Sequence, residues 1–199
     1  MTAYLTGLGL AAAAGLNAWA VLIVAHGLVR LLPQEFAGPA APLLEHPLLF
    51  QVALVLFLLE FVVDKIPLVD RLWHLAQTLL RPLAGALLGL ACIPAEGWPA
   101  RLGVGLTAAV VTLGTHVAKS TTRLTSTAAT KGWTQIAVSL AEDFVAVLLA
   151  ILVFFVPQVT PLFLVGLVLI LLTYRRRVRR GLQVLFFRLQ HPRRGARSA

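Results

Sequence analysis

Residues 47–66 have the sequence PLLFQVALVLFLLEFVVDKI, an apolar run that ends in charged residues. Its length matches the roughly 20 residues that an α-helix needs to cross a bilayer. Glu60 follows the apolar part directly, and a carboxylate in that setting costs free energy unless it faces protein, water or a counter-charge. The stretch therefore predicts a membrane-spanning helix with a polar end.

Further apolar runs lie on both sides of this stretch, and the whole chain has an unusual composition. Of the 199 residues, 59% are hydrophobic and 13% are charged, whereas soluble domains carry about 25% charged residues. We therefore expect an all-α, polytopic membrane protein with about six transmembrane helices. The other apolar runs cover approximately residues 3–32, 79–93, 100–118, 135–156 and 160–174.

The basic residues predict an orientation in the membrane. Arg30 and Arg101 fall on one side of the expected membrane, and the remaining Lys and Arg residues fall on the other. Because cytoplasmic loops carry an excess of Lys and Arg, we expect both termini in the cytoplasm. We divide the chain into a membrane domain, residues 1–174, and a basic amphipathic cytoplasmic tail, residues 175–199. Beside a membrane domain, such a tail favours anionic lipid over nucleic acid as its partner.

The first apolar run is long for a straight span and has Gly15 and Asn17 near its middle. A glycine and an amide side chain are what a helix break needs, because freed backbone groups must find partners away from lipid. The alternative is a continuous helix whose glycines and alanines pack closely, and we favour it.

Six spans with both ends on one side can also divide into two inverted three-helix halves. Gly7-Leu8-Gly9-Leu10 and Gly103-Val104-Gly105-Leu106 hint at such an internal repeat.

Two segments have the pattern of amphipathic helices. In residues 68–81, leucines fall on one helical face and charged residues on the other, and residues 181–190 carry apolar side chains between arginines. We expect the first segment at the cytoplasmic interface, before the third span.

Ionisable and polar residues gather at the ends of three predicted spans. Glu60 and Asp64 are four residues apart, and His116, Lys119 and Arg123 are spaced by three and four, so each group shares a helix face. All three spans have these ends on the cytoplasmic side, so we expect the groups to meet there. The candidate ion- or solute-binding residues are Glu60, Asp64, His116, Lys119, Arg123, Ser139, Glu142 and Asp143.

This polar cluster has two interpretations. In the first, the carboxylates coordinate a cation or relay protons, and the basic residues balance charge, gate, or replace the cation in the empty state. In the second, the cluster is a structural ion-pair network between spans. The sequence identifies no particular metal and no cofactor. It also has no zinc-spaced His and Cys set and no Gly-x-Ser-x-Gly motif, so we do not expect an enzyme.

The leading hypothesis is a small transporter or channel for an inorganic ion or small polar solute. The alternative is a non-transporting membrane protein that binds lipid or scaffolds a partner. It rests on the hydroxyl-rich, basic residues 120–132 and on the tail. A chain of this size leaves room for a homo-oligomer.

The three polar groups together resemble an uncharacterised prokaryotic membrane protein family, the domain of unknown function numbered 4126. The resemblance rests on Glu60; on Asp-Lys-x-Pro-x-x-Asp, residues 64–70; on His-x-x-Lys-x-x-x-Arg, residues 116–123; and on Ser-x-x-Glu-Asp, residues 139–143. Thr134-Gln135 departs from it, because the family pattern favours Asn-Pro there. The resemblance implies a multi-pass protein of the prokaryotic inner membrane, and it supplies no activity.

Overall fold

A computed structural model describes residues 1–63, 67–126 and 133–173. Every regular element within these ranges is a helix, which confirms the all-α class. The elements are α1 (Thr2–Ala14), α2 (Ala18–Leu31), the short 3-10 helix η1 (Pro33–Glu35), α3 (Ala41–Glu45), α4 (Pro47–Val63), α5 (Pro67–Cys92), α6 (Gly97–Ser126), α7 (Trp133–Phe155) and α8 (Val159–Thr173).

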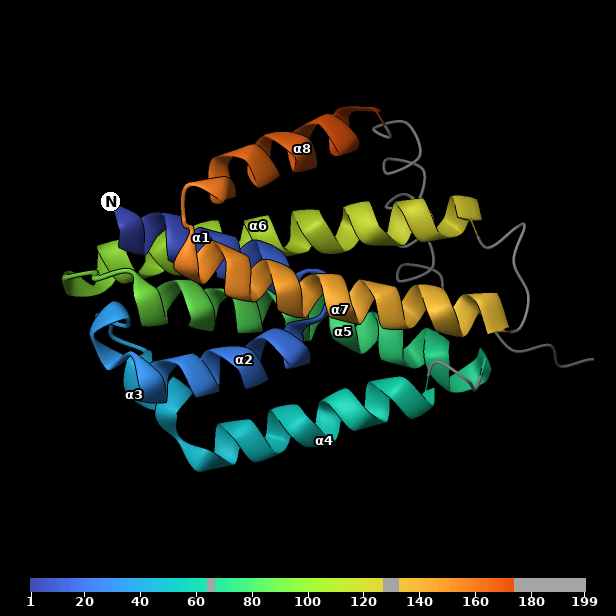
Figure 1. Ribbon diagram of the computed structural model, residues 1–199, viewed down its shortest axis with the longest axis horizontal. Helices are drawn as coiled ribbons and strands as arrows, with labels where there is room; N and C mark the ends of the chain where they lie inside the picture. Colours follow the sequence, from blue (N-terminus) through green and yellow to red (C-terminus); the bar gives the residue numbers. More distant parts are fainter. Residues whose placement is uncertain (64–66, 127–132, 174–199) are drawn as a thin grey trace, which may run out of the picture.

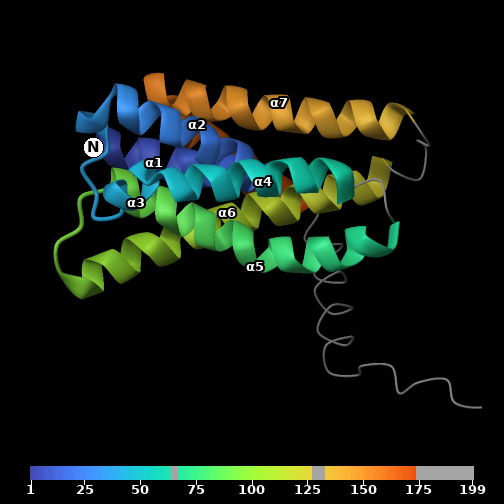
Figure 2. The same ribbon diagram turned by 90° about the horizontal axis from the view of Figure 1, so that it is seen from below.

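The first apolar run forms a hairpin of two helices, α1 and α2, that enters the bundle and turns back in its middle (Figures 1 and 2). At the start of α1, Gly7 packs against Cys92 and Ile93 at the end of α5. The chain after α2 returns to the same end of α5, where the Gly38 amide donates to the Ala91 carbonyl over 2.9 Å. The single continuous helix that we favoured from the sequence is therefore wrong.

Local chemistry explains why the chain turns at residues 15–17. Asn17 caps α2, since its side-chain oxygen accepts from the Ala20 amide at 3.0 Å. A Cβ atom at Gly15 would lie 2.5 Å from the Thr112 carbonyl oxygen, so glycine lets the turn pack directly on α6. With 13 and 14 residues, each hairpin helix is about 20 Å long, shorter than the roughly 30 Å hydrocarbon core of a bilayer.

Helices α4 to α8 run back and forth between the two ends of the bundle, with the hairpin among them (Figure 1). The chain therefore begins at one end of the bundle, and α8 runs away from that end. Because the hairpin turns back inside the bundle, two inverted halves of three helices are not confirmed. The glycine motifs differ too, since Gly7 is tightly packed and Gly103 faces open space.

The interior of the bundle combines a buried apolar core with many small side chains and a few polar ones. Ala11, Ala12, Ala13 and Ala14 of α1 are fully buried. Hydroxyl groups of the surrounding helices donate to α1 carbonyls, with Thr112 Oγ1 2.6 Å from Ala11 O and Thr160 Oγ1 3.0 Å from Leu5 O. These short contacts require small residues between the helices.

Many large apolar side chains lie on the outside of the bundle. Leu, Val, Ile and Phe residues are exposed along the outer faces of several helices. Examples are Val52, Val55 and Leu58 on α4; Leu102, Leu106 and Val110 on α6; Phe144, Leu148 and Phe155 on α7; and Leu162, Val165 and Leu169 on α8.

In the described part of the chain, one helical segment, Gly97–Ser120, is long and apolar enough to cross a membrane by length and composition. The other apolar segments that stand out are shorter, and they include both hairpin helices and α8. Six membrane spans are therefore not confirmed.

The amphipathic segment that we expected at a membrane interface is instead the first half of α5. This helix continues without interruption from Pro67 to Cys92. Arg81, which we counted among the basic residues on the cytoplasmic side, is buried inside the bundle. The second expected amphipathic segment and the tail lie outside the described residues.

Candidate functional site

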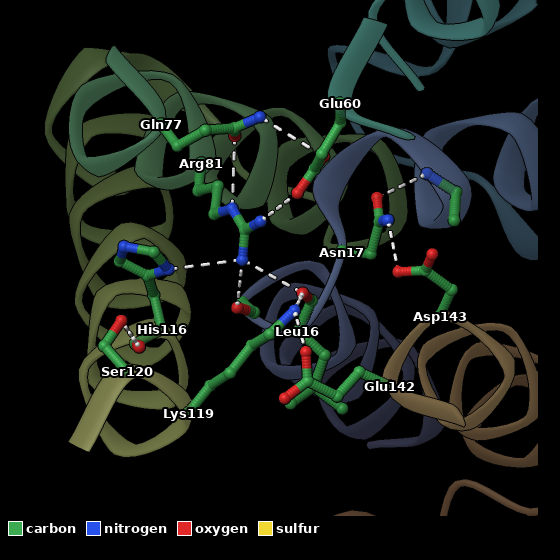
Figure 3. A network of polar contacts seen from close by, with 12 residues as sticks. Leu16, Asn17, Glu60, Gln77, Arg81, His116, Lys119, Ser120, Glu142 and Asp143 are labelled. Atoms are coloured by element: carbon green, nitrogen blue, oxygen red, sulfur yellow. Dashed lines mark hydrogen bonds and ion pairs between the residues drawn. The ribbon is translucent and has the colours of Figure 1, made fainter. Parts of the chain in front are cut away.

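Arg81 of α5 lies at the centre of a polar network around the hairpin tip (Figure 3). Its side chain is 3% exposed. Nη1 donates to the carbonyl oxygens of Gly15 and Leu16, each at 2.9 Å, and Nη2 lies 2.6 Å from Glu60 Oε1 on α4. One side chain thus joins α4 and α5 to the turn of the hairpin.

The hairpin turn exposes backbone carbonyls that α1 itself cannot satisfy, because the last carbonyls of a helix have no partner within it. The Ala12 and Ala13 carbonyls accept from amides of the turn, and the Asn17 carbonyl accepts from Val21. The Gly15 and Leu16 carbonyls instead face side chains of α5 and α6. The tip therefore presents two backbone oxygens to the middle of the bundle.

Gln77 and His116 complete the surroundings of Arg81. Gln77 accepts from Arg81 Nε at 3.1 Å and donates to Glu60 Oε2 at 3.2 Å. Arg81 Nη1 lies 3.2 Å from His116 Nδ1. Because a guanidinium has no acceptor, this contact places His116 Nδ1 beside an N–H donor.

Lys119, one turn after His116 on α6, contacts the same turn. Its Nζ donates to the Leu16 carbonyl at 2.7 Å and lies 3.1 Å from Glu142 Oε2 on α7. The Lys119 side chain is 9% exposed, and that of Glu142 is 19% exposed. Leu16 O therefore accepts from both buried cations, Arg81 and Lys119.

The start of α2 is held by a carboxylate. Asn17 Nδ2 donates to Asp143 Oδ1 of α7 at 2.8 Å. An acidic group beside a helix N-terminus and cations beside a helix C-terminus both complement the helix dipole. The two ends that meet at the hairpin tip thus each face charge of the favourable sign.

The described part of the cluster holds three carboxylates, Glu60, Glu142 and Asp143, against two cations, Arg81 and Lys119. Together with the tip carbonyls, it is a buried, oxygen-rich site of nearly balanced charge. Such a site can hold a cation or exchange one positive group for another. Within the described ranges, no group of three or more His, Cys, Asp or Glu side chains is arranged to hold a metal ion.

The structure brings together most of the candidate residues from the sequence. Glu60, His116, Lys119, Glu142 and Asp143 meet at the hairpin tip, as the shared end of their helices predicted. Ser139 lies on α7, about one turn before Glu142.

Other predicted features fall beyond what the structure describes. Asp64 lies outside the described residues, and so does the side chain of Arg123, whose backbone belongs to α6. The lipid-binding alternative rests on residues 120–132 and 175–199, which lie mostly outside them too, so it stays a prediction.

Sequence reasoning missed the central residue, Arg81, and its neighbour Gln77. A signal for both was present, because Gln77, Arg81, Gly85 and Gly89 repeat every four residues and share one face of α5. A Cβ atom at Gly85 would clash with the Thr112 side chain of α6, so this face packs directly on α6. The polar residues on it are therefore inside the bundle.

The comparisons with known proteins identify one family. The sequence model of a family described as "Domain of unknown function (DUF4126)" matches residues 4–177. No curated protein and no solved structure matches the chain.

Proposed function

The chain belongs to the DUF4126 family over a span that includes the hairpin and the polar cluster, and we propose that it is a membrane transporter or channel for a small ion or polar solute. One observation carries the proposal: a helical hairpin turns back in the middle of the bundle and presents two backbone carbonyls to buried cations. Non-helical backbone is tolerated at membrane depth only where protein or a polar pathway surrounds it. In transporters, interrupted helices with such ends form the ion and substrate sites.

The outer surface supports a membrane environment for this bundle. Large apolar side chains cover the outer faces of α4, α6, α7 and α8, whereas monomeric soluble proteins rarely expose contiguous apolar patches of more than a few hundred Å². In a bilayer, these faces would contact acyl chains. Helices α5, α6 and α7, with 26, 30 and 23 residues, are long enough to cross it.

With the hairpin in place, we propose an orientation different from the one that the sequence led us to expect. Arg30 at the end of α2 and Arg101 at the start of α6 lie at the end of the bundle where the hairpin enters. The arginine-rich residues 175–199 come after α8 in the sequence, and α8 runs toward the opposite end of the bundle. From the excess of basic residues on the cytoplasmic side, we propose that the N-terminus lies outside and that the residues after α8 lie in the cytoplasm.

A purely structural role for the cluster is the competing account. Burying a charge costs several kcal/mol, and replacing a buried ion pair by apolar side chains is often neutral or stabilising. Apolar packing could therefore hold α4 to α7 together at lower cost than Glu60, Arg81, Lys119 and Glu142. Because these charges are costly to bury, we infer that they have a function other than holding the helices together.

The test is ion flux into liposomes that contain the purified full-length chain. Gradients of Na⁺, K⁺, Cl⁻ and phosphate are imposed one at a time across vesicles of phosphatidylethanolamine and phosphatidylglycerol. We expect saturable flux of one of these ions, and a loss of at least tenfold in Glu142→Gln, whose amide oxygen can still accept from Lys119. Glu96→Gln, which changes an exposed carboxylate, is the matched control and should behave as the unaltered chain.

Two results would overturn the proposal. One is the absence of flux above empty vesicles for every ion tested, with the protein correctly inserted. The other is unchanged flux in Glu142→Gln, together with a lowered melting temperature, which is what a structural network predicts.

A further inference from the structure

The ammonium group of Lys119 occupies a position lined by oxygen atoms at the hairpin tip. The Leu16 carbonyl oxygen lies 2.7 Å from Nζ, and Glu142 Oε2 lies 3.1 Å from it. Backbone carbonyls and carboxylates are also the ligands that hard cations take in proteins. The ammonium thus lies where a free cation would find its ligands.

We propose that this position is a binding site for a small monovalent inorganic cation, which the Lys119 ammonium occupies in the structure and a free cation occupies when Lys119 withdraws. The inference rests on the proposed transport function and names its solute class. The two occupants exclude each other, because both use Leu16 O and the Glu142 carboxylate. The Lys119 ammonium then competes with the free cation and occupies the site when that cation is not bound.

Charge favours a monovalent ion over a divalent one. Exchanging one ammonium for one monovalent cation leaves the charge of the network unchanged, whereas a divalent ion would add a positive charge close to Arg81, which contacts the same Leu16 carbonyl. The site is therefore suited to a singly charged ion.

The two buried cations are suited to different roles. The planar guanidinium of Arg81 is fixed by the two tip carbonyls, Gln77 and Glu60 at once. Lys119 is a compact charge on a flexible four-carbon stem, so its ammonium can leave while the stem stays on α6. Arg81 therefore maintains the shape of the tip, and Lys119 is the group that exchanges.

The experiment removes the Lys119 ammonium and asks whether a free cation replaces it. In Lys119→Met, a stem of similar length lacks the charge, so Glu142 is left buried without its cation. The melting temperature of the purified full-length variant is measured against LiCl, NaCl, KCl and RbCl, with total ionic strength held constant by N-methyl-D-glucamine chloride. A ligand that binds only the folded state raises the melting temperature with its concentration.

We expect a saturable rise with at least one of these ions in Lys119→Met, and an apparent affinity at least tenfold higher than in the unaltered chain. Arg30→Met removes an exposed cation and should show no such ion-specific rise. The double variant Lys119→Met/Glu142→Gln keeps the pair neutral and should lose the ion dependence. If Lys119→Met can be purified only in the presence of one of these ions, that too supports the site.

The inference is overturned if Lys119→Met responds equally to all salts and to N-methyl-D-glucamine. It is also overturned if that variant fails to fold in every salt while the neutral double variant folds. Failure of the two proposals can be distinguished. An ion-specific shift without flux in liposomes would overturn transport and leave the site, whereas flux of an anion with no cation-dependent shift would overturn the site and leave transport.

Discussion

Arg81 and Gly15, 66 positions apart in the chain, are joined by a hydrogen bond of 2.9 Å from a guanidinium to a backbone carbonyl. The bond exists because the first apolar run turns back at Gly15 and exposes that carbonyl inside the bundle. The same guanidinium pairs with Glu60 at 2.6 Å. The polar cluster and the hairpin are therefore one structure, and a change in either should alter both.

Removing Arg81 should strongly destabilise the fold. Arg81→Met leaves Glu60 buried without its counter-charge and the Gly15 carbonyl without its donor, and breaking a buried pair in this way costs about 3–5 kcal/mol. The melting temperature in detergent should fall accordingly. Arg101→Met, at an exposed position, is the control with little expected effect. An unchanged melting temperature in Arg81→Met would contradict the central place of this residue.

Two glycines of the hairpin should respond oppositely to alanine. Gly15→Ala places a Cβ atom 2.5 Å from the Thr112 carbonyl oxygen and 2.5 Å from Thr115 Cβ, and such overpacking costs about 1–3 kcal/mol. Gly27→Ala, in α2, meets nothing within 4 Å and should be neutral or stabilising by about 0.5–1 kcal/mol, because alanine favours helix. Thermal unfolding of both variants measures the difference. Equal effects would show that the tip does not pack on α6 as described.

Asn17 and Asp143 should tolerate an exchange of their side chains better than either change alone. Asn17→Asp keeps an N-cap oxygen but places two carboxylates where a 2.8 Å hydrogen bond now lies, so it should destabilise the chain. Adding Asp143→Asn restores one amide and one carboxylate with their roles reversed. We expect a favourable coupling of about 0.5–3 kcal/mol in the double-mutant cycle. Strictly additive effects would mean that the two side chains do not interact.

The sequence predicted the meeting of Glu60, Lys119 and Glu142 for a simple physical reason. Charged residues near the ends of antiparallel helices converge when those ends share one side, and the apolar runs define the ends clearly. The family resemblance pointed to the same residues, which lie within the matched span.

Arg81 and the hairpin could not be predicted in the same way. Arg81 lies among charged and apolar residues whose pattern fits an interfacial helix equally well, and only its packing on α6 decides that it is buried. The turn at Gly15 and Asn17 has a local signal, but the length of the run alone also fits one tilted span. Whether α2 continues across or turns back depends on partners distant in the chain, such as Arg81, Lys119 and Asp143.

The most direct test of the account is the sidedness of the hairpin in intact membranes. With Cys92 replaced by serine, single cysteines are introduced at Thr2, Glu45 and Glu96, and each is labelled by an impermeant maleimide added from one side of the membrane. The account predicts that all three are labelled from the same side, opposite to a cysteine placed in the tail at Ser198. Labelling of Thr2 from the side of Ser198, with Glu45 on the other, would show that the first run crosses the membrane and would contradict the hairpin.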